Sequence, residues 1–239
     1  MIHHNNQDRL SDNETYWEKV SNTKWGAYTT DIARQAILLA HNLSGKPSTA
    51  LEIGCEGGRW SKLLADFGWS MICTDINEEP LKICQKKIPF ANCILVQPGD
   101  NKIPCEADSV NLLLCVEVPP VIESDWFIEE AFRVLRNDGL VIGVFWNLLS
   151  LRGLFAHIKA SFGGGFDYYK INYRFWKKNL LSKRFRMRYE EGYCWFPFPR
   201  TSNSVLIPFF TSFEKKLGLR KITTFSPWIV FIAQKKQPC

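Results

Sequence analysis

The fold of this chain is decided by residues 51–60, which read L-E-I-G-C-E-G-G-R-W. A short apolar run leads into a glycine-rich turn, and the residues after the turn carry apolar side chains at helical spacing. Glycines let the backbone approach a ligand closely, and the first turn of a helix offers unpaired amide groups and a partial positive charge. The stretch therefore predicts a strand, a ligand-binding turn and a helix.

The positions of the glycines distinguish two kinds of nucleotide-binding turn. The dinucleotide pattern G-x-G-x-x-G, begun at Gly54, needs glycines at positions 56 and 59, where this chain has Glu56 and Arg59. The pattern G-x-G-x-G needs glycines at positions 56 and 58, and only Glu56 departs from it because Gly58 is present. The second pattern is favoured.

Segments of strand type and of helix type alternate through the first half of the chain. Strands are predicted at 49–53, 69–74, 92–96, 109–115 and 140–146, and helices at 59–67, 78–87 and 121–135, with a turn at 137–139. Such alternation is typical of parallel strands joined by crossover helices. It predicts a doubly wound α/β sheet.

The whole chain, residues 1–239, is expected to form a single domain. A helical arm at 1–45, with helices at 13–20 and 31–43, precedes the sheet. A basic, aromatic lid and acceptor region at 148–188 is inserted after the fifth strand; its lid covers 148–167, and a helix follows at 172–182. The remaining predicted elements are a strand at 185–195, a helix near 203–217 and a closing strand at 228–233.

Further motifs follow the predicted strands in order. They read C-T-D-I-N at 73–77, P-G-D-N at 98–101, D-S-V-N-L-L-L-C-V-E at 108–117 and A-F-R-V-L-R-N-D-G-L at 131–140. Together with the glycine turn, this set resembles the class I S-adenosylmethionine-dependent methyltransferases over residues 52–146. The resemblance implies a Rossmann-like sheet, mostly parallel with an antiparallel last strand and helices on both faces. It also implies S-adenosyl-L-methionine as the cofactor.

The resemblance assigns roles to residues around the first two strands. It implies that Glu52 holds the methionine end of the cofactor, and that Gly54, Cys55 and Gly58 form the turn beside it. Asp75 would accept hydrogen bonds from both ribose hydroxyls, and hydrogen bonds to a charged group contribute ~1.5–3 kcal/mol each. The alternative for Asp75 is that it caps the following helix.

The resemblance places the adenine ring beside the third and fourth strands. It implies that Asp100 pairs with the adenine amino group, that Ile76 and Asn101 flank the ring, and that a backbone carbonyl near Cys115 meets the amino group of the cofactor. By themselves, residues 99–101 read G-D-N, which is the composition of a simple turn.

Two positions depart from the family pattern. Glu56 adds a side chain where the backbone usually passes close to the cofactor, so it either points outward or faces a cationic part of the cofactor. After the fourth strand many relatives read E-V-L-E-H, whereas residues 117–121 of this chain read E-V-P-P-V. The histidine that relatives use as a base is therefore missing.

Methyl transfer to a hydroxyl benefits from a general base, whereas a carboxylate or an ionised phenol needs none. His157, in the expected lid, is the preferred catalytic candidate, with a role in packing or at the surface as its alternative. The other candidate bases are Asp167, Tyr168, Tyr169 and Glu117.

Charge is concentrated in one segment. Residues 150–188 carry ten Lys and Arg residues and one acidic residue, a net charge of +9, whereas the rest of the chain is at −3 and the whole chain at +6. The segment is interpreted as a solvated amphipathic helix, as the site of an anionic or aromatic acceptor, or as a contact with an anionic membrane. The acceptor interpretation and the membrane interpretation are compatible if the acceptor is lipid-linked.

We therefore expect methyl transfer to a small-molecule acceptor, with an oxygen of an anionic, aromatic or amphiphilic metabolite favoured. RNA methylation is an alternative because of the basic segment, although no separate RNA-binding module is visible and no nucleic acid is the expected partner. A non-catalytic, cofactor-binding descendant of the fold is the other alternative. The sequence does not indicate the oligomeric state.

Metal chemistry is not expected, because the eight cysteines form no C-x-x-C pair and the four histidines are dispersed. Scattered cysteines are typical of reduced thiols. The longest nearly apolar stretch, residues 139–151, is shorter than the ~20 residues of a membrane span, and the N-terminus has no secretory pattern. A cytoplasmic protein is expected, with peripheral membrane contact as a further possibility.

Overall fold

The computed structural model describes residues 14–163 and 168–237, which contain one seven-stranded sheet of order β3-β2-β1-β4-β5-β7-β6. Strands β1 to β5 run parallel, and β7 runs antiparallel to both of its neighbours, β5 and β6. This confirms the predicted topology. The strands are β1 (Thr49–Ile53), β2 (Ser70–Asp75), β3 (Asn92–Leu95), β4 (Val110–Cys115), β5 (Leu135–Trp146), β6 (Phe185–Tyr193) and β7 (Trp228–Lys235).

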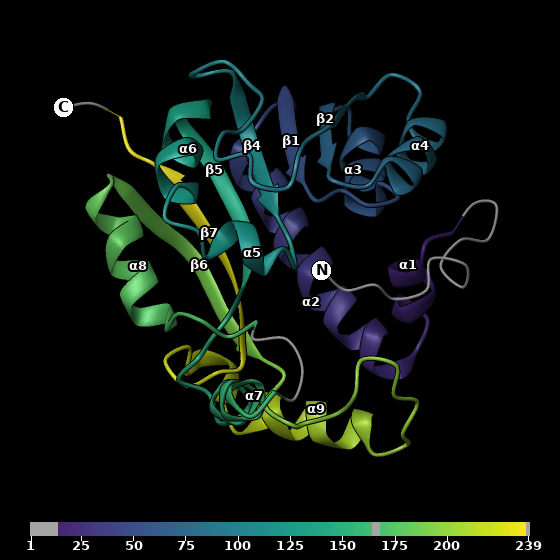
Figure 1. The fold of residues 1–239 in the computed structure, drawn as a ribbon, viewed down its shortest axis with the longest axis vertical. Coiled ribbons are helices and arrows are strands. Elements are labelled where there is room, and N and C mark those ends of the chain that lie inside the picture. The colour runs from purple at the N-terminus through teal and green to yellow at the C-terminus, as the bar shows by residue number, and fades with distance from the viewer. Residues whose placement is uncertain (1–13, 164–167, 238–239) are drawn as a thin grey trace.

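Helices cover both faces of this sheet (Figure 1). Alternate residues of a strand point to opposite faces, so Leu112 and Leu114 pack against the side that carries α2, α3 and α4, while Leu113 packs against α5, α6 and α8. The helices are α1 (Tyr16–Ser21), α2 (Lys24–Ser44), α3 (Arg59–Asp66), α4 (Glu78–Lys87), α5 (Pro119–Ile122), α6 (Phe127–Val134), α7 (Leu151–Ser161), α8 (Tyr173–Ser182), α9 (Ile207–Lys216) and the 3-10 helix η2 (Leu219–Lys221).

The predicted helix at 121–135 is wrong in one respect, because the structure divides it into α5 and α6. Proline is well suited to the first turn of a helix, and Pro119 begins the short α5. Strand β5 then begins at Leu135, five residues before the predicted start at 140. The predicted turn at 137–139 lies inside this strand, where Asp138 has a φ of 63°.

The arm begins its long helix earlier than predicted. Helix α2 begins at Lys24 because the side chain of Thr23 accepts a hydrogen bond of 3.1 Å from the backbone of Gly26. Residues 1–13 of the expected arm and residues 164–167 of the expected lid lie outside the described residues. Among the helices of the described ranges, none is long and apolar enough to cross a membrane.

Candidate active site

A cavity of about 1240 Å³ lies at the carboxyl ends of β1, β2, β4 and β5. This is the edge at which doubly wound sheets bind ligands. One side, which we call the glycine-turn half, is lined by Glu52, Gly54, Cys55, Asp75, Ile76 and Pro98. The other side, the aromatic half, is lined by Trp17, Glu117, Trp146, Tyr168, Lys170, Arg200 and Trp228.

Glu52 brings a buried carboxylate to the cavity at the end of β1. Its side chain accepts a hydrogen bond from the Ser61 hydroxyl, on α3. Burial raises the pKa of Glu52 to about 8, and the Ser61 hydrogen bond and the nearby Arg59 oppose this rise only in part. Glu52 therefore keeps its proton near neutral pH, and a cationic ligand group, such as the ammonium of an amino-acid ligand, would stabilise the ionised carboxylate in place of that proton.

Asp75 organises the turn from the end of β2. One carboxylate oxygen accepts the backbone N–H of Glu56 at 2.9 Å, and the other accepts that of Asn77 at 2.9 Å. The residue at the N-cap of α4 is Asn77 rather than Asp75. Asp75 also lines the cavity, and burial raises the pKa of its carboxyl, although the hydrogen bonds from the Asn77 and Glu56 backbone oppose this rise.

Gly54 and Gly58 are needed in the turn for different structural reasons. Gly54 lines the cavity with a φ of 66°, and a Cβ there would lie 2.7 Å from Val118 Cγ2. Gly58, with a φ of 75°, is not among the lining residues; a Cβ there would lie 2.5 Å from Cys84 Sγ. Gly58 thus permits the close approach of α3 and α4, whereas Gly54 faces the cavity.

Glu56 turns toward the N-terminal arm. Its backbone adopts a φ of 49°, which favours glycine, and its carboxylate accepts hydrogen bonds from the Thr15 side chain and the Trp17 backbone. Burial raises the pKa of Glu56 to about 7, and these hydrogen bonds limit the rise. The arm is also held by an ion pair between Glu18 and Lys87. The departure from the glycine pattern therefore coincides with the attachment of α1.

Besides Gly58, three residues expected at the cofactor do not line the cavity. Asp100 and Asn101 are exposed. Asp100 accepts a hydrogen bond of 2.8 Å from the backbone N–H of Gln97, a contact that agrees with the interpretation of this motif as a simple turn. Cys115 is fully buried, and the two residues after it, Val116 and Glu117, line the cavity instead. The predicted strand end at Cys115 is confirmed, and the cavity lining begins with the next residue.

The preferred catalytic candidate is also outside the cavity. His157 lies exposed on α7, a helix that contributes no lining residue, so it has no position from which to act on a ligand there. Of the other candidate bases, Glu117 and Tyr168 line the cavity, and Tyr169 is buried where it accepts the Trp228 indole N–H at 3.0 Å. Asp167 lies outside the described residues.

Arg200 is the centre of the aromatic half. Its guanidinium carbon lies 4.7 Å from the ring of Trp17, 4.9 Å from that of Trp146 and 4.7 Å from that of Trp228. Trp146 and Trp228 stack on each other at 5.1 Å, and Arg200 pairs with Glu117 at 2.9 Å. None of these four cationic and aromatic residues was predicted at the site from the sequence, where only the ends of β5 and β7 could have pointed to the tryptophans.

The cover of the cavity comes from α1 rather than from the expected lid. Four residues of α1, Tyr16, Trp17, Val20 and Ser21, line it. Among the described residues of the region 148–188, only Tyr168 and Lys170 do so.

Most of the basic residues in that region lie elsewhere. Arg186 and Arg188 on the edge strand β6 hydrogen bond to Gln234, and Lys177 on α8 pairs with Glu190 at 2.7 Å. The expected concentration of positive charge around the acceptor is therefore reduced to Lys170 and, from another segment, Arg200.

Three cysteines that are far apart in the sequence meet beneath the glycine turn. The Sγ atoms of Cys55, Cys73 and Cys84 all lie within 4.8 Å of one another, and all three side chains are buried. Strands β1 and β2 and helix α4 bring them together. Dispersion along the chain is therefore no argument against a thiol cluster in this fold.

The glycine turn, the two carboxylates at adjacent strand ends and the strand order occur together, and a family profile described as a methyltransferase domain matches residues 51–143. Residues 51–143 are a methyltransferase domain. Its class I character, predicted from the motifs, is confirmed by this match and by the fold.

The domain is similar to known proteins over limited lengths. An uncharacterised methyltransferase-like protein of Schizosaccharomyces pombe is 30% identical over 107 residues, which are 44% of this chain and 40% of that protein. The chain thus spans about two fifths of the length of the curated relatives that it matches.

Two solved structures share the fold of the methyltransferase domain. A SAM-dependent methyltransferase of Methanosarcina mazei has a TM-score of 0.58 and 18% identity, and the match covers 84% of this chain and 98% of that one. Geranyl diphosphate C-methyltransferase of Streptomyces coelicolor has a TM-score of 0.60 and 13% identity, with 89% and 82% covered.

Proposed function

We propose that this protein transfers a methyl group from S-adenosyl-L-methionine to a small-molecule acceptor. An oxygen of an anionic, aromatic or amphiphilic metabolite is the favoured methyl acceptor. The proposal rests on one observation: two buried carboxylates, at the ends of β1 and β2, share one cavity with an aromatic, cationic wall. A methyltransferase needs both parts in one space, because it aligns the donor with the acceptor and removes water from both.

The glycine-turn half fits the cofactor. Glu52 would hold the ammonium group, since the carboxylate is buried and its charge is only partly compensated. Gly54 and Cys55 would lie along the cofactor, and Asp75 would accept the ribose hydroxyls. Ile76, half-exposed at the cavity edge, would cover the adenine. When bound, the cofactor supplies an electrophilic methyl group on a sulfonium.

The aromatic half fits an acceptor that is planar or apolar and carries negative charge. Trp146 and Trp228 offer ring faces, and Lys170 and Arg200 offer positive charge. Within the described residues, Trp146 Nε1 and Arg200 Nη2 are buried without a hydrogen-bond partner, which supports a ligand that carries acceptor atoms.

Glu117 is our choice for the general base. It is a carboxylate on the cavity wall, and for a hydroxyl acceptor it would take the proton that the oxygen loses. A carboxylate acceptor carries no such proton, and then Glu117 would serve only to position Arg200. Because the fold is also similar to that of a C-methyltransferase, the experiment must distinguish methylation of an oxygen from methylation of a carbon.

The test has two steps. Calorimetry with S-adenosyl-L-methionine measures cofactor binding, and absence of binding in the micromolar range would refute the proposal. Methyl-labelled cofactor is then incubated with the protein and, in separate samples, with a metabolite extract or with total RNA, and the labelled product is identified by mass spectrometry. Label in a small molecule supports the proposal; label in RNA supports RNA methylation, and cofactor binding with no transfer to either supports the non-catalytic alternative.

A further inference from the structure

Helix α7 turns its apolar side toward solvent. Its large apolar residues recur at helical spacing and are all exposed, with exposed fractions of 72% for Phe155 and 88% for Phe162 just after the helix. Only Gly153 of this helix is buried. The exposed set is Leu151, Leu154, Phe155, Ile158 and Phe162. An amphipathic helix in a globular protein normally buries this stripe, so the arrangement is inverted.

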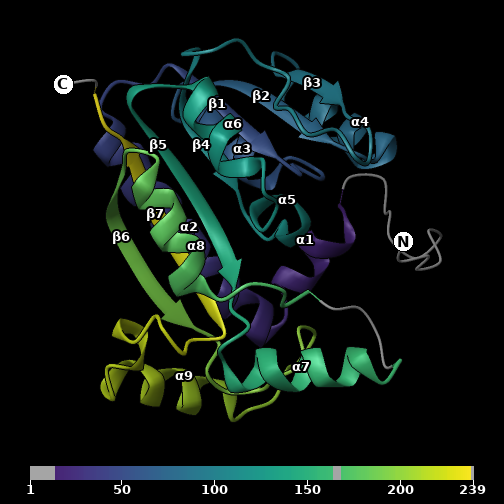
Figure 2. The same cartoon turned by 60° about the vertical axis from the view of Figure 1, so that its left-hand side comes forward.

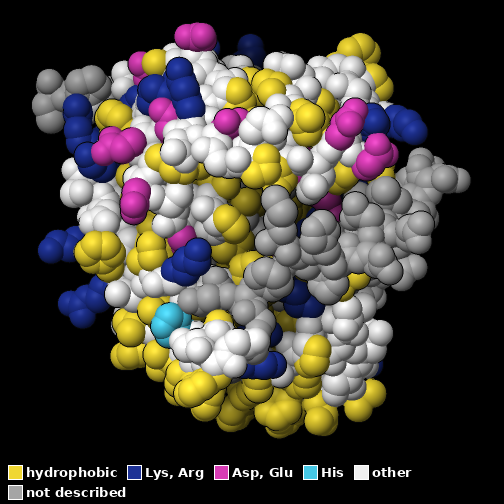
Figure 3. All heavy atoms as spheres, in the orientation of Figure 1, with side chains coloured by type: hydrophobic (Ala, Val, Ile, Leu, Met, Phe, Trp, Pro, Cys, Tyr) yellow, Lys and Arg dark blue, Asp and Glu magenta, His cyan; other side chains and the backbone are white. Residues whose placement is uncertain are grey.

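Helix α9 has the same inversion. Its exposed apolar residues are again one helical stripe, with exposed fractions of 78% for Val205, just before the helix, and 63% for Phe209. The set is Val205, Leu206, Phe209, Phe213 and Leu217. Helices α7 and α9 lie at the same end of the molecule (Figures 1 and 2), where apolar side chains form the lower border of the surface (Figure 3). We call these ten residues the α7–α9 face.

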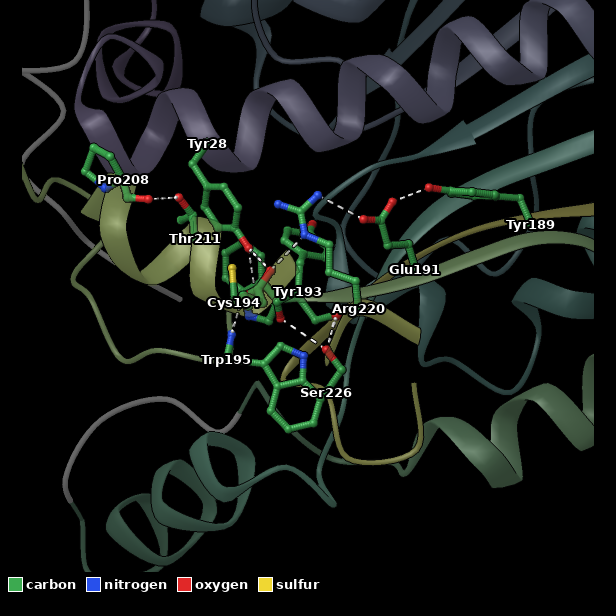
Figure 4. Close-up of polar contacts among 12 residues, drawn as sticks. Tyr28, Tyr189, Glu191, Tyr193, Cys194, Trp195, Pro208, Thr211, Arg220 and Ser226 are labelled. Atoms are coloured by element: carbon green, nitrogen blue, oxygen red, sulfur yellow. Dashed lines mark hydrogen bonds and ion pairs between the residues drawn. The ribbon is translucent and has the colours of Figure 1, made fainter. Parts of the chain in front are cut away.

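Polar contacts hold α9 from its inner side (Figure 4). Glu214, the only acidic residue of α9, is fully buried; it accepts the Tyr28 hydroxyl at 2.6 Å and the Arg220 Nε–H at 3.1 Å. Arg220 also pairs with Glu191 on β6 at 3.0 Å. A buried carboxylate needs such partners. The helix is therefore anchored through its polar residues in a defined orientation, with its aromatic stripe outward.

The exposed charged residues of α7, of α9 and of the described segments that flank them, residues 148–163 and 204–223, are all positive. Lys159 on α7, Lys215 and Lys216 on α9 and Lys221 after it are exposed, and residues 148–163 contain no Asp or Glu. In residues 204–223, the only acidic residue is the buried Glu214. The face thus combines an apolar surface with unneutralised lysines, and it has no exposed acidic residue on either helix.

Monomeric proteins rarely leave contiguous apolar patches of this kind exposed. We propose that the α7–α9 face docks onto the surface of an anionic lipid bilayer. Apolar side chains would enter the boundary between headgroups and acyl chains, and the lysines would contact anionic headgroups. A second copy of the chain is disfavoured as the occupant, because face-to-face pairing would bring the lysines of both copies together.

The inner side of the same surface borders the cavity. Arg152 of α7 donates to the backbone carbonyl of Phe198 at 3.3 Å, and its guanidinium lies 5.8 Å from the ring of Trp228. Phe210 of α9 packs on Phe198 at 5.8 Å. Docking would therefore hold the aromatic half close to the bilayer. This consequence for the acceptor rests on the proposed function, whereas docking itself does not.

Flotation with lipid vesicles tests the proposal without any assay of activity. We expect the full chain to float with vesicles of phosphatidylcholine containing about a third phosphatidylglycerol, and to bind pure phosphatidylcholine at least tenfold more weakly. The double variant Phe155→Ser/Phe209→Ser should weaken binding more than tenfold, because each ring leaves water on docking. Lys215→Glu/Lys216→Glu should weaken binding to anionic vesicles alone.

Two matched variants control for general effects. The segment between α4 and β3 lies away from α7 and α9 (Figure 2). Phe90 in this segment is 99% exposed, so Phe90→Ser removes an equally accessible ring. Lys178→Glu changes an exposed charge on α8. Both should bind like the unaltered protein. The proposal would be overturned if the full chain failed to float with anionic vesicles. It would also be overturned if the control variants lost as much vesicle binding as the variants in the α7–α9 face. Concentration-dependent dimerisation in ultracentrifugation, abolished by Phe155→Ser/Phe209→Ser, would instead assign the face to a second copy.

Discussion

Arg200 and Glu117 form an ion pair of 2.9 Å in the wall of the cavity, although one lies between β6 and α9 and the other follows β4. Both side chains are about one fifth exposed, so the pair is open to the cavity. The guanidinium also packs on three tryptophans, one of which, Trp17, belongs to the arm. One side chain therefore connects the arm, the sheet and the expected acceptor space.

We predict that Arg200→Lys raises the KM for the acceptor at least tenfold and leaves the Kd for the cofactor within twofold. Lysine keeps the charge but loses the planar stacking and the forked hydrogen bonding of the guanidinium. Steady-state kinetics and calorimetry measure the two quantities. Lys178→Arg, on the surface of α8, is the control and should change neither. If Arg200→Lys weakened cofactor binding as much as it raised the KM for the acceptor, Arg200 would act on the glycine-turn half instead.

Asp75→Ala should weaken cofactor binding by ~1–3 kcal/mol, because charge-assisted hydrogen bonds to the ligand are lost. The variant also removes the acceptor of the Glu56 and Asn77 amides, so Asp75→Asn, which retains one carbonyl oxygen, should lose less. Asp100→Ala is the matched control, since Asp100 is exposed and does not line the cavity. If calorimetry finds a larger loss at Asp100 than at Asp75, the sequence-based adenine assignment is right and the cavity assignment is wrong.

Cofactor affinity should rise with pH between about 6 and 8. The folded protein keeps a proton on Glu52 up to a pKa of about 8, whereas the unfolded chain loses it near 4.5. The free energy of unfolding therefore decreases as pH rises through this window, and a cationic ligand must displace the proton. Calorimetry in buffers of different ionisation enthalpy should detect proton release on binding.

The variant Glu52→Gln should abolish that pH dependence and bind the cofactor more weakly at pH 8. Because the pKa of Glu56 is raised to about 7, Glu56→Gln must be measured beside it. Proton release that survives in Glu52→Gln and disappears in Glu56→Gln would move the assignment to Glu56.

Glu56→Gly should loosen the arm while preserving the turn. Glycine relieves the positive φ, a gain of about 1 kcal/mol, but the hydrogen bonds to Thr15 and Trp17 are lost at about 0.5–1.5 kcal/mol each. Stability should change little, and hydrogen exchange of the α1 amides should accelerate relative to those of α3. Unchanged exchange in α1 would mean that Glu18 and Lys87 alone hold the arm.

His157→Ala should leave the turnover number unchanged, because His157 lies on the outside of α7. Glu117→Gln should lower it by about 10²–10⁴ for a hydroxyl acceptor, the usual effect of removing a general base. A rate loss in His157→Ala with normal activity in Glu117→Gln would reverse the two assignments.

The strands and the glycine turn could be predicted because their signals are local. Alternating apolar runs locate β1 to β5, and the turn chemistry of residues 54–58 identifies the ligand side of the sheet. Errors occurred where neighbouring segments decide the outcome. The division of the helix at 121–135, and the extension of β5 back to Leu135, depend on pairing with β4 and on packing beneath it.

The site shows the same division. Glu52, Gly54, Cys55, Asp75 and Ile76 could be found because each occupies a set position relative to a strand end. Gly58, Asp100, Asn101 and Cys115 satisfy the same pattern, yet none of the four lines the cavity. Position in a motif does not determine on which side of the backbone a cavity opens.

The amino-acid sequence alone was sufficient for the fold class, the methyltransferase motifs and the excess of positive charge. Composition and short-range periodicity carry the first and the last, and the resemblance of local motifs to a known family carries the second. Only the tertiary structure located Arg200 between three tryptophans, joined Glu56 to the arm and directed the apolar stripes of α7 and α9 outward. These arrangements depend on contacts between segments that are distant in the chain. Such contacts are set by the packing of the whole molecule and leave no periodic signal in the sequence.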